Sequence, residues 1–110
     1  MSHTALIQRQ LDAYNAQNLD AYVSCYAPDV VVAGLNGAVT ETGREALRAR
    51  YAKAFAAYPK NKAHLKNRIE VGSIVIDHEH VVRAPGGEEF EIIAIYTVKD
   101  GLIARVDFAK

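Results

Sequence analysis

The sequence predicts an α+β fold in which three helices precede a meander of long strands. In the first half of the chain, apolar residues recur at spacings of three and four, the period of an amphipathic helix. From Lys62 onward apolar and polar residues alternate, and turn residues separate the alternating runs. No repeat, linker or low-complexity segment interrupts the 110 residues, so we expect a single domain spanning residues 1–110.

The helices are predicted at residues 4–17, at residues 19–27 and from Thr42 to about Tyr58. Asn18 is a suitable N-cap for the second helix, and Pro28 is expected to end it. Thr42 and Glu45 match a capping box, which predicts the start of the third helix.

The strands are predicted at residues 30–35, 38–40, 62–71, 74–83, 88–99 and 102–108. Asn36-Gly37, Gly72-Ser73 and Asp100-Gly101 are typical hairpin turns, and Pro85-Gly86-Gly87 joins the fourth and fifth strands. Helices followed by a meander of this kind indicate a mostly antiparallel sheet with helices on one face.

The hairpin turns also predict a strand register. If Val71 faces Ile74, the further cross-strand pairs are Asn67–His78, Leu65–His80, Arg68–Asp77 and Lys66–Glu79. The last two pairs join opposite charges, which favours this register. If Lys99 faces Leu102, Ile95 meets Val106 and Ile93 meets Phe108. The face predicted to lie under the helices then collects Leu65, Ile69, Ile74, Ile76, Val82, Ile93, Ile95, Val106 and Phe108.

His78 and His80 fall on this predicted inner face, among branched apolar residues. Imidazoles titrate near neutral pH, so we predict that these two histidines are general acid–base residues. Two alternatives to this catalytic role remain. The histidines could be structural, with hydrogen bonds to Asn67 and to a tyrosine hydroxyl, or they could bind a metal ion together with Glu91. Since no further ligand cluster is visible, we expect neither a metal nor another cofactor.

The opposite face of the fifth strand is apolar as well, through Phe90, Ile92, Tyr96 and Val98. A strand that is apolar on both faces requires cover on both. Three helices suffice for one face, so we predict that the other forms a homodimer with a second copy of the chain.

Composition restricts the class of protein. Thirteen basic and thirteen acidic residues give a formal net charge of zero, without a basic block, so we expect no nucleic-acid partner. No apolar run has the length of a membrane span, and the first residues do not resemble a signal peptide. We therefore predict a cytoplasmic protein with no membrane partner. The single cysteine, Cys25, has no partner for a disulfide.

Several segments resemble the nuclear transport factor 2-like superfamily, in its SnoaL polyketide-cyclase and ketosteroid-isomerase-like branch. They are Tyr14–Tyr22, Tyr26–Val30, Gly43–Leu47, Asp77–Glu79 and Lys99–Ile103. The resemblance spans most of the chain. It implies a cone-shaped, cystatin-like roll, in which three helices pack in the concave face of a curved mixed sheet. A pocket at the wide end and a dimer through the sheet are also implied.

The resemblance further implies a site for a small hydrophobic molecule. The predicted pocket residues are Gln10, Tyr14, Tyr26, Tyr51, Phe55, Asn67, Ile93, Ile95, Val106 and Phe108. Where ketosteroid isomerases carry a tyrosine and two aspartates, this sequence has Gln10, Gly34 and Ile95, so steroid isomerisation by that route is not expected. The function predicted is acid–base isomerase, cyclase or hydrolase chemistry. The alternative is a non-catalytic small-ligand-binding or dimerisation module.

Overall fold

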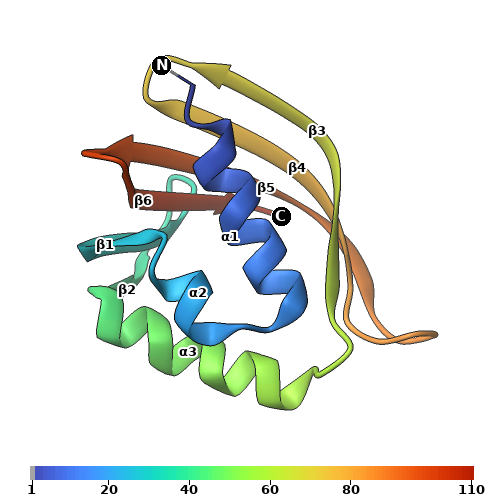
Figure 1. Cartoon of the computed structure of the whole chain (residues 1–110). Helices are drawn as coiled ribbons and strands as arrows, with labels where there is room; N and C mark the ends of the chain where they lie inside the picture. Colours follow the sequence, from blue (N-terminus) through green and yellow to red (C-terminus); the bar gives the residue numbers. More distant parts are fainter. Residues whose placement is uncertain (1) are drawn as a thin grey trace.

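The computed structural model describes residues 2–110 and shows three helices against one face of a curved six-stranded sheet (Figure 1). The helices are α1 (Thr4–Ala16), α2 (Leu19–Val23) and α3 (Arg44–Ala57). The strands are β1 (Tyr26–Gly34), β2 (Val39–Thr42), β3 (Lys62–Val71), β4 (Ile74–Val82), β5 (Glu89–Lys99) and β6 (Leu102–Ala109). The predicted α+β cone is confirmed.

The sheet has the order β2-β1-β6-β5-β4-β3. Neighbouring strands are antiparallel except for β1 and β6, which run parallel, so the sheet is mixed. The long strands β3 to β6 curve around α1, while α3 lies across the other end of the molecule (Figure 1). A cavity lined by residues of the sheet and of the helices lies between them.

Two boundaries differ from the prediction. The second helix ends at Val23 rather than at Ala27, because Tyr26 already pairs with Ile103 of β6. Pro28 therefore lies within β1, at a point where the pairing with β6 is interrupted. Because proline has no backbone N–H, this interruption lets it occupy the strand without removing a hydrogen bond from the sheet.

The third helix begins differently from the predicted capping box. Thr42 is the last residue of β2, and the N-cap is Gly43, with no side-chain cap. Gly43 adopts φ 91° and ψ 154°, which allows the chain to turn from the strand directly into α3.

The predicted registers are confirmed at the start of each hairpin. Val71 pairs with Ile74, Asn67 with His78, Arg68 with Asp77, and Lys99 with Leu102. Irregularities then shift two of the ladders. Between Leu65 and Asn67 the register slips, so that His64 faces His80 and Leu65 faces Glu79. Between Thr97 and Val98 it slips again, so that Val106 faces Tyr96 and Phe108 faces Ala94.

The assignment of faces on β4 and β5 is wrong. The helix-covered core contains Val75, Ala94, Tyr96 and Val98, which are at most 5% exposed. The residues predicted to lie inside, including Ile76, His78 and Ile95, are on the outer face. Because side chains alternate along a strand, one wrong choice of parity reverses every residue of both strands.

The four residues assigned to the dimer interface therefore lie on the inner face. Tyr96 and Val98 are core residues, and Phe90 and Ile92 face a cavity under the helices. The outer face has its own apolar residues, among them Ile69 and Val71, which are 60% and 77% exposed. The homodimer stays a prediction, on a different set of side chains.

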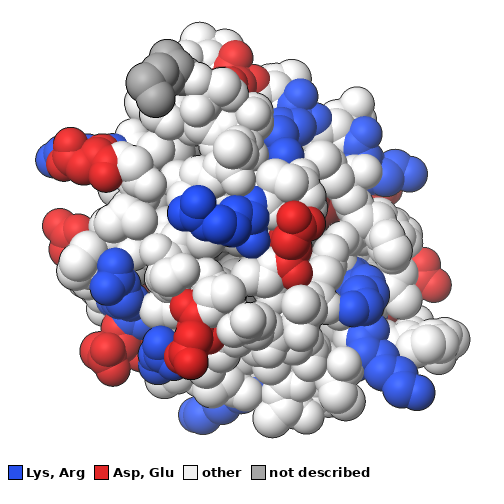
Figure 2. All heavy atoms as spheres, in the orientation of Figure 1, with Lys and Arg blue, Asp and Glu red and all other residues white. Residues whose placement is uncertain are grey.

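Surface charge agrees with the balanced composition. On the face shown in Figure 2, acidic and basic side chains are interspersed, and neither sign forms a block. Within residues 2–110 no helix combines the length and the hydropathy that a membrane crossing requires.

Candidate active site

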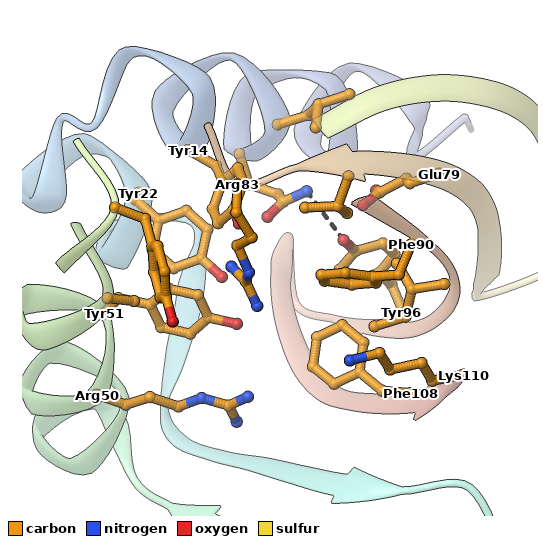
Figure 3. A pocket seen from close by; sticks show the side chains of 16 residues that line it. Tyr14, Tyr22, Arg50, Tyr51, Glu79, Arg83, Phe90, Tyr96, Phe108 and Lys110 are labelled. Carbon is orange, nitrogen blue, oxygen red and sulfur yellow. Dashed lines mark hydrogen bonds between the residues drawn. The ribbon is translucent and has the colours of Figure 1, made fainter. Parts of the chain in front are cut away.

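A cavity of about 330 Å³ lies between the inner face of the sheet and the helices (Figure 3). Aromatic rings form much of its wall, and a few polar groups are set among them. Its lining residues are Gln10, Leu11, Tyr14, Tyr22, Arg50, Tyr51, Ala54, Tyr58, Glu79, Val81, Arg83, Phe90, Ile92, Tyr96, Phe108 and Lys110.

Gln10 connects two tyrosines at the base of the cavity. The Tyr26 hydroxyl donates to Gln10 Oε1 at 2.9 Å. Gln10 Nε2 donates to the Tyr96 hydroxyl at 3.0 Å, the hydrogen bond drawn as a dashed line in Figure 3. Burial raises the pKa of Tyr96 well above its usual value, so this hydroxyl remains protonated. Since Tyr96 accepts from Gln10, its own proton is left for a ligand.

On the helical side of the cavity, the Tyr14 hydroxyl likewise accepts a hydrogen bond from a side-chain amide. Asn61 Nδ2 donates to the Tyr14 hydroxyl at 2.6 Å, and burial raises the pKa of Tyr14. Its ring packs against Tyr22 and Phe55 with centroids 5.9 and 5.7 Å apart. These edge and tilted contacts fix the ring and hold its hydroxyl in place.

Glu79 is the acidic residue of the cavity wall. It lies on the inner face of β4, is 6% exposed, and its Oε2 is buried without a hydrogen-bond partner among the described residues. Burial, reinforced by the negative charge of Asp77, raises the pKa of Glu79 to about 7. A carboxyl group of this kind can both accept and donate a proton near neutral pH.

Asp77 is fully buried two residues before Glu79, and Arg68 compensates its charge. Arg68 Nε and Nη2 donate to the two carboxylate oxygens of Asp77 at 2.6 and 2.9 Å, and Arg68 Nη1 donates to Gln8 at 2.8 Å. Asp77 is therefore held by a bidentate pair, whereas Glu79 has no such partner.

Arg83 follows the end of β4 and projects into the cavity between the aromatic groups (Figure 3). Its guanidinium carbon lies 4.9 Å from the ring centres of both Tyr58 and Phe90. Nη1 donates to Asn61 Oδ1 at 3.1 Å, whereas Nε is buried without a hydrogen-bond partner among residues 2–110.

Four of the predicted pocket residues line the cavity: Gln10, Tyr14, Tyr51 and Phe108. Tyr26, Phe55 and Val106 lie in the core that supports it. Asn67, Ile93 and Ile95 are on the outer face. Ala94 and Tyr96, the neighbours of Ile95 in β5, point inward, so the Ile95 side chain points away from the cavity.

His78 and His80 also lie outside the cavity. On the outer face, His78 Nε2 is 2.6 Å from Glu91 Oε1, and His80 Nε2 is 2.7 Å from Glu89 Oε1. Both imidazoles are 33% exposed. Each histidine is thus paired with its own carboxylate. The described residues contain no group of three or more His, Cys, Asp or Glu side chains that could hold a metal ion.

Glu79, Arg83 and Tyr96 are the site residues that the sequence analysis missed. Strand alternation placed Glu79 on the face opposite Ile74 and Ile76, where it was paired with Lys66. Tyr96 was assigned to the dimer interface. One signal was available: Val75 and Val81 share the row of Asp77 and Glu79, so this row is also apolar at its ends.

A family model described as a SnoaL-like domain matches residues 7–106. The chain belongs to the SnoaL-like domain family. This confirms the resemblance seen in the sequence and agrees with the helix-filled curved sheet.

Solved structures support the same assignment. A cystatin-fold protein from Novosphingobium aromaticivorans is 36% identical, with a TM-score of 0.93, and the match covers 100% of this chain and 99% of that one. A proposed polyketide cyclase from Sinorhizobium meliloti is 25% identical, with a TM-score of 0.82 and coverage of 99% and 100%. A proposed ketosteroid isomerase from Kribbella flavida, 19% identical, shares the fold with a TM-score of 0.82 over 96% of this chain and 75% of that one. The comparison with curated proteins gives no match.

Proposed function

We propose that this SnoaL-like protein binds a small, largely apolar carbonyl compound in the cavity and catalyses proton transfer, with Glu79 as the base. The observation that carries the proposal is a carboxyl group that lines an aromatic cavity, has a pKa of about 7 and has one oxygen buried without a hydrogen-bond partner among the described residues. The base is thus expected on the inner row of β4, rather than at His78 or His80.

The proposed reaction is an isomerisation through an enolate. The Glu79 carboxylate takes a proton from the carbon beside the carbonyl, and the C–H electron pair moves to form the enolate. The hydroxyls of Tyr14 and Tyr96 donate hydrogen bonds to its oxygen, because each keeps its proton. In a substrate with a β,γ carbon–carbon double bond the intermediate is a dienolate, and protonated Glu79 returns the proton to its γ-carbon, which moves the double bond into conjugation with the carbonyl and restores the carboxylate.

Hydrogen exchange tests this proposal without knowledge of the natural substrate. Hydrophobic cyclic and aryl ketones are incubated with the protein in D2O, and loss of their α-protons is followed by proton NMR. Wild type should accelerate exchange above the buffer rate, and Glu79→Gln should reduce the acceleration by about 100-fold or more. His78→Gln is the matched control and should exchange like wild type.

The same samples distinguish an enzyme from a non-catalytic binding module. Binding of each ketone is measured by saturation-transfer NMR. Ketones that bind wild type and Glu79→Gln alike, with no exchange by either, would favour the binding module. A panel that neither binds nor exchanges would contradict the proposed cavity function.

We further propose that the chain forms a homodimer through the outer face of the sheet. Ile69, Ile76 and Ile95 form a cross-strand row on this face, and exposed Val71 extends the apolar surface. Contiguous exposed apolar surface of this kind supports a protein interface. A cytoplasmic location remains part of the proposal.

A further inference from the structure

We infer that the ligand is a hydrophobic acid whose anionic oxygens bind the free edge of Arg83 at the cavity. This inference rests on the proposed function of the cavity and adds the chemical class of the ligand. The starting observation is the buried Arg83 Nε, a charged donor that has no hydrogen-bond partner in the described chain.

The contacts of Arg83 leave part of its guanidinium group for an acceptor. The rings of Tyr58 and Phe90 each make a cation–π contact with it, with the ring centres 4.9 Å from the guanidinium carbon. Donors of a guanidinium lie in its plane, and Nη1 is already bonded to Asn61. Nε and Nη2 together form the edge that receives a carboxylate through two parallel hydrogen bonds.

The charges around the cavity favour an anion. Arg50, Arg83 and Lys110 line it, against the single carboxyl of Glu79. Arg50 is paired with Glu41 at 2.6 Å, and the Lys110 ammonium lies 3.9 Å from the ring centre of Phe90. Of these three cations, Arg83 is the one with a buried donor that lacks a partner among the described residues.

Glu88 is the nearest competitor for Arg83. Its Oε1 lies 4.0 Å from Arg83 Nε, beyond hydrogen-bond distance, and its side chain is 63% exposed. An exposed carboxylate at this distance contributes little attraction, and a ligand carboxylate can take its place. The competition makes a specific prediction, because removing the charge of Glu88 should strengthen binding of an acid.

The aromatic walls define the remainder of the ligand. Tyr14, Tyr51 and Phe108 line the same cavity, so a flat apolar body can pack against them. A volume of about 330 Å³ suits a molecule of about two fused rings. With its acid group at Arg83, such a molecule directs its apolar part toward the carboxyl of Glu79.

Two probes of matched shape test the inference: 2-naphthoate and 2-naphthalenemethanol, titrated by NMR or calorimetry. Wild type should bind the acid at least tenfold more tightly than the alcohol. Arg83→Gln should remove this preference, and Arg83→Lys should restore part of it, because lysine keeps the charge without the two-donor edge. Glu88→Gln should tighten binding of the acid and leave the alcohol unchanged.

Arg105→Gln is the control, because Arg105 lies outside the cavity and is paired with Asp107. It should retain the wild-type preference. Equal binding of both probes to wild type, or a preference that survives Arg83→Gln, overturns the inference and leaves the proposed cavity intact. If neither probe binds wild type, the inference fails; the ketone exchange experiment then decides the proposed function separately. Glu88→Gln gives an answer even if the Arg83 variants do not fold.

Discussion

At the scale of single residues, β4 carries two carboxylates with different environments. Asp77 has a bidentate arginine partner, whereas Glu79 is buried with one oxygen unpaired. Burial, together with the negative charge of Asp77, raises the pKa of Glu79. The chemistry proposed for the cavity follows from this difference between neighbours on one strand.

The raised pKa of Glu79 predicts a dependence of stability on pH. The carboxyl titrates at about 7 when folded, against an ordinary value of 4.5, so the folded state binds its proton more tightly. Stability is therefore lost as the pH rises between these two values. For wild type, the cost of ionising Glu79 should reach up to about 3 kcal/mol above pH 8.

Urea unfolding of wild type and Glu79→Gln from pH 5 to pH 8 measures this cost. The variant should resemble wild type at pH 5 and become more stable than it by pH 8. Taking the difference removes every contribution that the two proteins share. A difference that stays constant across the range would show that Glu79 titrates normally.

At the scale of the secondary-structure elements, the entry into α3 depends on one glycine. Gly43 has φ 91° and ψ 154°, a region that residues with a Cβ rarely adopt, and no side chain caps the helix. Gly43→Ala should therefore lower the free energy of unfolding by roughly 2 kcal/mol. Chemical denaturation measures the change.

Gly34→Ala at the end of β1 is the matched control. A Cβ built at Gly34 meets no atom within 4 Å, and its φ is not in the positive range. Its stability should change by less than about 0.5 kcal/mol. Equal effects of the two substitutions would indicate that α3 does not require this backbone conformation.

At the scale of the whole molecule, the proposed homodimer depends on the outer face of the sheet. Ile76 is half-buried in the centre of this face and pairs with Ile69 and Ile95 on its two sides. Ile76→Glu should give a folded monomer, because a dry interface would bury the new charge without a partner. Sedimentation gives the mass, and circular dichroism verifies folding.

Ala52→Glu is the control for this prediction, since Ala52 is exposed on α3, away from the sheet. It should keep the wild-type mass. A wild-type protein that sediments as a monomer, or an Ile76→Glu variant that stays a dimer, would contradict the proposed interface.

The sequence alone determined the class of fold, the number of helices, the long strands and the turns between them. Those features depend on local spacing, on turn residues and on the family resemblance, all of which are readable along the chain. It also indicated four cavity residues, Gln10, Tyr14, Tyr51 and Phe108, through the family resemblance.

Only the tertiary structure decided which face of β4 and β5 lies under the helices. Both faces of these strands are partly apolar, so alternation alone cannot orient them. The branched apolar residues Ile74, Ile76 and Val82 then favoured the wrong face. The buried carboxylate of Asp77, on the other face, is held by Arg68, which reaches across from β3. The register slip at Thr97–Val98 separates the parity of β5 from that of β6, so Val106 was placed on the correct face although Ile95 was not. Burial of Glu79 and the unpaired Nε of Arg83 result from contacts between segments that are distant in the sequence.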